Sequence, residues 1–312
     1  MFGATKSTVR NLPPTWTRWR PALLPMAMAI ALSLVGASGA SAATTGGNLD
    51  YPAAHAQPLP DDSATGDGVT SDSVNCPSGF PHPVGGGIRI DGSDPGLDLE
   101  VHASGPTATG WATAGNNNAG VTATMTTFTI CAAGTYFYPS KTVKIKPNHV
   151  ATLKVSCPAG TQVIGGGVSI IGGDHADEVR ASEPADGSDA DHAVNDAWYG
   201  AAGNGSSVKV KLKVTAICDG SGATYQIKSH APVLLTTGHK NSSQVMCPSG
   251  TRLVGGGADV SGANTNMEIH DMYPIDGSDS DANPDNGFTA TGYNDGDPAT
   301  RQLITIAICK DV

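Results

Sequence analysis

Three kinds of feature are scarce in this 312-residue sequence: aromatic side chains, long apolar runs and the short motifs of nucleophilic catalysis. Aromatic residues make up 5% of the chain, and beyond residue 43 no apolar run approaches the length of a membrane-spanning helix. GxSxG, HExxH and CxxC motifs are missing, which argues against serine hydrolases, zinc proteases and cysteine-paired zinc sites. Strand-forming residues follow each GGG, so a phosphate-binding loop, which needs a following helix, is not expected.

Helical periodicity is also missing after residue 43, and 40 Gly and 21 Pro interrupt the chain too often for long helices. The clearest pattern is that of a strand. In the stretch "VKVKLKVTAIC" (208–218), valine and leucine alternate with lysine, which predicts one buried and one solvated face. We therefore expect an all-β domain.

Residues 1–42 have the features of a secretory signal peptide. Four basic residues precede or flank the start of the apolar run "ALLPMAMAIALSLVGA" (22–37), and "ASA" (40–42) offers a cleavage site after Ala42. A membrane anchor is the alternative, but the run is short and no basic stop-transfer flank follows it. The prediction is a secreted, extracellular protein without a transmembrane segment in its mature chain.

Acidic residues dominate this predicted mature chain. Cleavage removes four of the 18 Lys and Arg residues and none of the 28 Asp and Glu residues, which leaves a formal charge of −14. A strongly acidic surface repels phosphate backbones, so nucleic acid is not expected as a partner. Cation binding is compatible with such a charge.

One unit is repeated three times. The phrases "CPSGFPHPVGGG" (76–87), "CPAGTQVIGGG" (157–167) and "CPSGTRLVGGG" (247–257) each precede a second shared phrase and then a strand that ends in cysteine. Such self-similarity indicates repeated structural units. The predicted fold is all-β, with three tandem disulfide-clipped units of four or five strands in a pseudo-threefold, β-prism-like or β-sandwich-like arrangement. The predicted segments are a signal peptide (1–42), a disordered linker (43–73) and units over 74–133, 134–220 and 221–312.

All six cysteines lie in the predicted exported part, and an even number there favours disulfides. Several connectivities are open from the sequence alone. The repeat makes one bridge per unit the simplest, which gives Cys76–Cys131, Cys157–Cys218 and Cys247–Cys309.

The succession of CPxG, GGG, proline, an aromatic residue, asparagine and a closing strand resembles repeats of uncharacterised secreted actinobacterial proteins, over residues 74–311. More distantly, the three β-units with CPxG turns are similar to the vitelline membrane outer layer proteins, which are three-sided β-prisms. The spacing differs and the units here are longer. These resemblances imply a pseudo-threefold β-architecture and no particular activity.

Three consecutive glycines weaken a strand unless a bulge or a large neighbour needs the bare backbone. The aromatic residue of the same unit, Trp111, Trp198 or Phe288, is expected to lie over these glycines. The alternative is that the rings form a sugar-stacking platform. The asparagines that follow the rings are further ligand candidates: Asn116, Asn204 and Asn294.

Carboxylates are the other candidates. The loops "DGSDADHAVND" (186–196) and "DGSDSDANPDN" (276–286) are either solvated surface or weak Ca²⁺ sites. Their candidate metal ligands are Asp186, Asp189, Asp191, Asp276, Asp279 and Asp281. One equivalent position in each unit holds Glu100, Glu178 or Glu268, two residues before His102, Arg180 or His270. These pairs are interpreted as structural charges, ligand-binding groups or half of an acid–base site.

Three functions stay open. They are a secreted, non-catalytic binding or envelope-associated protein with a carbohydrate as candidate ligand, an extracellular structural protein without a ligand, and a polysaccharide hydrolase that uses loop carboxylates. Repetition argues against catalysis, because an enzyme seldom needs three copies of its site. The expected partner is an extracellular glycan or envelope component, and Ca²⁺ is the one candidate cofactor.

Overall fold

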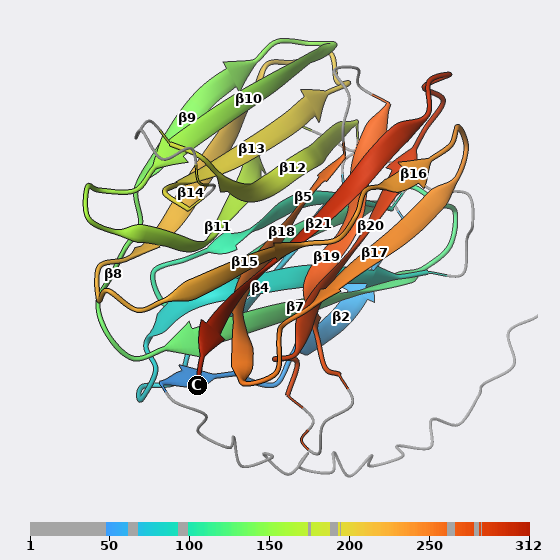
Figure 1. The fold of residues 1–312 in the computed structure, drawn as a ribbon. Coiled ribbons are helices and arrows are strands. Elements are labelled where there is room, and N and C mark those ends of the chain that lie inside the picture. Colours follow the sequence, from blue (N-terminus) through green and yellow to red (C-terminus); the bar gives the residue numbers. More distant parts are fainter. Residues whose placement is uncertain are drawn as a thin grey trace, which may run out of the picture. The chain divides into compact units, whose positions relative to one another are not determined.

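The computed structural model describes residues 48–61, 68–92, 99–173, 176–187, 193, 195–260, 266–277, 281 and 283–312, all within one compact unit, Ser41–Val312. These residues form 21 β-strands and no helix (Figure 1). No apolar helix long enough to cross a membrane is therefore found among them. The all-β prediction is confirmed, whereas the predicted signal peptide lies outside the described residues.

The strands form three antiparallel sheets of seven strands each. Sheet A contains, in order, β1 (Leu49–Asp50) together with β2 (His55–Leu59), β7 (Ala123–Ala132), β4 (His82–Asp91), β19 (Met267–Ile275), β20 (Gly287–Asn294) and β17 (Lys240–Met246). Sheet B contains β3 (Val69–Asn75), β6 (Gly110–Asn117), β5 (Leu99–Pro106), β11 (Gln162–Ile171), β14 (Val210–Asp219) and then β8 (Tyr136–Phe137) together with β9 (Ser140–Ile145). Sheet C contains β10 (His149–Ser156), β13 (Ala197–Asn204), β12 (Asp177–Ala185), β18 (Thr251–Val260), β21 (Arg301–Asp311) and then β15 (Tyr225–Ser229) together with β16 (Val233–Leu235).

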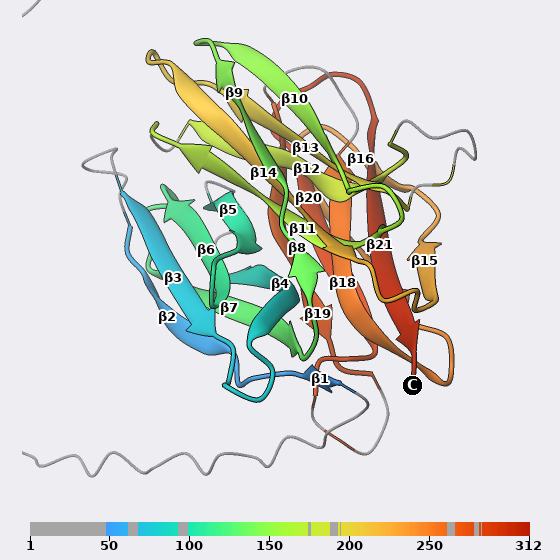
Figure 2. The same ribbon diagram turned by 90° about the vertical axis from the view of Figure 1, so that its left-hand side faces the viewer.

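Each repeat is divided between two sheets. The first repeat places β2, β7 and β4 in sheet A and β3, β6 and β5 in sheet B, where Figure 2 shows the last three beside one another. The second repeat continues sheet B and begins sheet C, and the third completes sheets C and A. The repeats therefore close into a ring of three sheets, which is the β-prism-like form of the two predicted arrangements. Each repeat has seven strands, more than the four or five expected, because the segments interpreted as connections are edge strands.

The prediction that 43–73 form a disordered linker is wrong for the described residues 48–61 and 68–73. They contain β1, β2 and most of β3, which pair with β7 and β6. The Tyr51 hydroxyl, on a side chain that is 7% exposed, donates a hydrogen bond of 2.6 Å to the Leu253 carbonyl oxygen. This polar segment is ordered because it completes the first repeat, as β9 and β10 complete the second.

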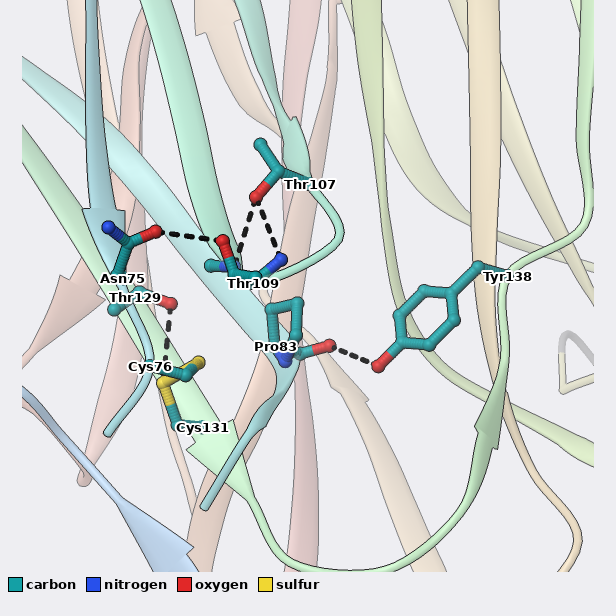
Figure 3. Close-up of a disulfide and its surroundings, with 9 residues drawn as sticks. Asn75, Cys76, Pro83, Thr107, Thr109, Thr129, Cys131 and Tyr138 are labelled. Carbon is teal, nitrogen blue, oxygen red and sulfur yellow. Dashed lines mark hydrogen bonds between the residues drawn. A yellow bond between two sulfur atoms is a disulfide. The ribbon is translucent and has the colours of Figure 1, made fainter. Parts of the chain in front are cut away.

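Each disulfide joins two neighbouring sheets. Cys76 follows β3 of sheet B and is bonded to Cys131 in β7 of sheet A (Figure 3). The bridges Cys157–Cys218 and Cys247–Cys309 join sheets C and B, and sheets A and C, in the same way. All three predicted pairs are confirmed, and none of the six cysteines is free.

The three glycines of each GGG have three different neighbours. In the second repeat, a β-carbon on Gly165 would collide with the backbone of β4, because β4, β11 and β18 pack against one another. A β-carbon on Gly166 would collide with the ring of Trp198, and one on Gly167 with the backbone of Gly105 in β5. The other repeats show the same pattern. The first glycine therefore allows close packing of the three central strands, the second makes room for the aromatic ring of its own repeat, and the third allows close contact with the backbone of a neighbouring repeat. A bulge directly before each GGG, at residues 84, 164 and 254, confirms that expectation.

Candidate functional site

The aromatic residues of the repeats are core residues. Trp111, Trp198 and Phe288 are at most 2% exposed, and each lies against the second glycine of its own GGG. The two indole N–H groups donate hydrogen bonds of 3.0 Å to Ser104 Oγ and Ser182 Oγ. The predicted packing of ring over glycine is confirmed. The sugar-stacking alternative is wrong, because no ring face is open to a ligand.

The asparagines are structural, and one was assigned one position too early. Asn117, and not Asn116, is the first-repeat equivalent of Asn204 and Asn294. The Nδ2 atoms of these three donate to the carbonyl oxygens of Leu59, Ile145 and Leu235, at 2.9, 3.2 and 3.3 Å. They therefore hold the ends of the edge strands β2, β9 and β16.

The three equivalent glutamates converge. Glu100 in β5, Glu178 in β12 and Glu268 in β19 come from three different sheets, and one carboxylate oxygen of each lies within 4.8 Å of the others. This glutamate cluster is the one group of three metal-ligating side chains found in the described part of the chain. Convergence follows from the fold, because β5, β12 and β19 pack against one another.

The partners of the glutamate cluster differ between repeats. In register with the glutamates lie Asn116, Gly203 and Tyr293. Asn116 Nδ2 donates to Glu100 Oε2 at 3.1 Å and lies 3.4 Å from His102 Nε2. The sequence pattern did not single out Asn116 for this place, because its equivalents are a glycine and a tyrosine.

A bulge in each of β5, β12 and β19 falls on the residue two positions after the glutamate. His102, Arg180 and His270 are skipped in the pairing and are at most 5% exposed. Bulges redirect side chains and are frequent beside functional sites. Lys240 Nζ donates to His270 Nε2 at 2.6 Å, whereas the guanidinium of Arg180 has no hydrogen-bond partner among the described residues.

Burial controls the protonation of the cluster. Burial raises the pKa of Glu178 to about 8, against the lowering effect of the Arg180 charge. Burial raises the pKa of the Glu268 carboxyl well above its usual range, and the charges of Glu100 and Glu178 raise it further. Burial lowers the pKa of Arg180. Such a cluster can hold protons or a cation, but Glu100 and Glu268 are less than a tenth exposed, so a sugar ring cannot reach them.

The acidic loops are described only in part, because Asp189, Asp191 and Asp279 lie outside the described residues. Of the others, Asp281 accepts a hydrogen bond of 2.9 Å from the Asn283 backbone N–H and lies 3.9 Å from Arg252 Nη2. In the loop 186–196, Lys154 Nζ donates to the backbone carbonyl oxygen of Asp186 at 2.7 Å. The Ca²⁺ prediction for these loops stays a prediction.

A basic surface lies on the outer face of β9 and β14. Lys211 stands directly opposite Lys144, and Lys213 stands opposite Thr142. Lys146 directly follows β9 and Lys209 directly precedes β14, and all five lysine residues are exposed. This surface, the lysine face, consists of Lys144, Lys146, Lys209, Lys211 and Lys213. The alternation of the sequence predicted it as a solvated face but not as a site.

A pair of carboxyl groups makes the stability dependent on pH. Burial raises the pKa of Glu183 in β12 to about 8, helped by the charge of Asp259 in β18, and burial raises the pKa of Asp259 to about 6. Both folded-state pKa values exceed the ordinary ones, so the folded protein keeps protons that the unfolded chain has released. This contribution to stability is complete below the ordinary pKa values of the two carboxyl groups. It is lost as the pH rises from there to the folded-state values, about 6 for Asp259 and about 8 for Glu183.

Replacing Glu183 with glutamine is therefore expected to leave the free energy of unfolding almost unchanged at pH 5. At pH 9 it should raise that free energy by about 1–2 kcal/mol, less than the full shift because part of the side chain is exposed. Urea unfolding at both pH values measures the difference, with Asp276→Asn as the exposed control. A variant less stable than the wild type at pH 9 would contradict the expectation.

Compared with known proteins, the chain matches no protein-family model, and no curated protein is significantly similar to it.

Proposed function

We propose that this is a secreted, non-catalytic binding protein that attaches to an anionic polysaccharide of a cell envelope through the lysine face. The observation that carries the proposal is a set of five exposed lysines on one face of a protein with a formal charge of −10. In the described part of the chain, no ion pair joins any of the five to a carboxylate. Like charges directly opposite one another, as at Lys211 and Lys144, destabilise a sheet, so the arrangement favours an anionic partner over a purely structural role.

The spacing of the lysine face suits a linear polyanion. Alternate residues of a strand lie about 7 Å apart, and neighbouring strands lie about 4.8 Å apart. The charges of Lys209, Lys211 and Lys213 therefore repeat along roughly 14 Å, a length over which a flexible acidic polymer presents several charges. The three disulfides are consistent with function outside the cell, where they persist.

Binding to immobilised polygalacturonate and heparin, with neutral dextran as reference, tests the proposal. The double change Lys144→Gln, Lys211→Gln should weaken binding to the acidic polymers by about tenfold at low salt and reduce the slope of log affinity against log salt by about 1–2. The control Lys228→Gln, Lys310→Gln has the same net charge but changes sheet C, and it should bind as the wild type does.

Other outcomes overturn the proposal. Equal losses in the two double variants would indicate a general charge effect without a site. No binding to any acidic polymer at 50 mM salt (a value on the order of those used for weak polyanion binding) would favour a structural protein without a ligand. Tighter binding to duplex DNA than to either glycan would identify nucleic acid as the partner, and release of reducing ends would indicate a hydrolase.

A further inference from the structure

The glutamate cluster has the dimensions of a single-ion site. One carboxylate oxygen each of Glu100, Glu178 and Glu268 lies within 4.8 Å of the other two. Two oxygen ligands of one Ca²⁺ ion, each about 2.4 Å from it, lie at most about 4.8 Å apart. A separation of this order is compatible with three carboxylates that share one ion.

Two of the glutamates and a neighbouring asparagine have unsatisfied acceptor atoms. Glu178 Oε2, Glu268 Oε1 and Asn116 Oδ1 are buried atoms with no hydrogen-bond partner among the described residues. Asn116 is no part of the acidic cluster, is 0% exposed, and lies against Glu100 through its Nδ2. Buried acceptors without a donor cost free energy, and groups of this kind need an explanation such as a bound ion. A cation held between the carboxylates would supply a partner that the described residues do not.

Carboxyl groups outnumber cationic side chains around the glutamate cluster. Arg180 acts on Glu178 and Lys240 acts on Glu268, and each favours the charged form of its carboxylate. The charge of Asp295 disfavours the charged form of both glutamates, and the charge of Asp177 disfavours that of Glu178. Five carboxylates thus face two cationic side chains. Asp295 is exposed, whereas the other four are buried or partly buried, and negative charge in such surroundings is unfavourable unless protons or a further cation compensate it.

We propose that the glutamate cluster binds one divalent, oxygen-preferring cation, of which Ca²⁺ is the type. Three carboxylates and an amide oxygen are hard ligands that suit Ca²⁺ better than soft transition metals. Glu178 is the most exposed of the three glutamates, so the ion enters on its side. The site takes one ion per chain, because each repeat supplies a single ligand. The site is separate from the lysine face. It is also separate from the acidic loops, where binding would give two ions per chain, one in each of two repeats.

Terbium luminescence and calorimetry with Ca²⁺ test the site on the whole protein. Tyr293 lies opposite Glu268 in the sheet and is a suitable sensitiser for bound Tb³⁺. We expect one ion per chain, displacement of Tb³⁺ by Ca²⁺, and a melting temperature about 2 °C or more higher in saturating Ca²⁺ than in chelator. Glu268→Gln should abolish the luminescence and the shift, whereas Asp186→Asn with Asp276→Asn should leave both unchanged.

The remaining results each contradict the proposal. Two ions per chain that are lost with Asp186→Asn and Asp276→Asn would place binding in the acidic loops. A second contrary result has two parts: no ion binds at millimolar Ca²⁺, and Glu268→Gln is more stable than the wild type by the same amount in Ca²⁺ and in chelator. This result would show that the glutamates share protons instead of an ion. If Glu268→Gln does not fold, Glu178→Gln at the more exposed position supplies the same comparison.

Discussion

Replacing Gly165 with alanine is expected to lower the free energy of unfolding by about 3 kcal/mol or more, one of the largest effects of a single methyl group in this protein. The added β-carbon would lie well inside 3.0 Å of the Val84 carbonyl oxygen. That atom belongs to backbone in β4, which is paired on both sides and cannot turn away as a flexible side chain can. The same contact recurs in cyclic order, from Gly85 to Val254 and from Gly255 to Ile164.

Urea unfolding of Gly165→Ala and Gly255→Ala measures the effect, and the two variants should lose similar amounts. The matched control is Gly79→Ala, because a β-carbon there meets nothing within 4 Å. This control should stay within about 0.5 kcal/mol of the wild type. If Gly165→Ala were as stable as Gly79→Ala, the three central strands could not pack through bare backbone as described.

Removing one disulfide is expected to cost about 4 kcal/mol, as the chain-entropy account predicts for loops of this length. The double change Cys157→Ala, Cys218→Ala releases a bridge between residues 61 apart that joins sheet C to sheet B. With aromatic residues at only 5% of the chain, the core has few large side chains to compensate. Denaturant unfolding of this variant beside the wild type under oxidising conditions gives the difference.

The other two bridges serve as matched comparisons, because their sequence separations are 55 and 62. Loops of such similar length differ by only about 0.1 kcal/mol in the entropic account, so the three double variants should lose nearly equal stability. A loss below about 1 kcal/mol for all three would contradict a stabilising role. One variant losing far more than the others would indicate local packing at that bridge instead of chain entropy.

Local patterns predicted those features of this protein that depend on one repeat at a time. The cysteine pairs, the ring over the second glycine and the solvated face of the strand at 208–218 each involve residues of one unit and are confirmed. Predictions that treated polar composition as disorder were wrong, as at 48–59, because a few buried side chains, those of Leu49, Tyr51 and Leu59, and backbone hydrogen bonds to a neighbouring strand order this segment. Asn116 was mistaken for Asn117 because two adjacent asparagines look alike until the register is known.

The sequence by itself determined the three units, their all-β character and one bridge per unit as the simplest cysteine pairing, since periodicity, glycine position and cysteine spacing are properties of the chain near each residue. Only the tertiary structure decided that every sheet is shared by two repeats, that β5, β12 and β19 meet, and that three glutamates from positions 100, 178 and 268 come within 4.8 Å. The physical reason is that strand pairing between repeats is non-local. The glycines of each GGG allow backbones of different repeats to pack closely, because no side chain lies between them. The local sequence does not indicate which repeat supplies the neighbouring strand.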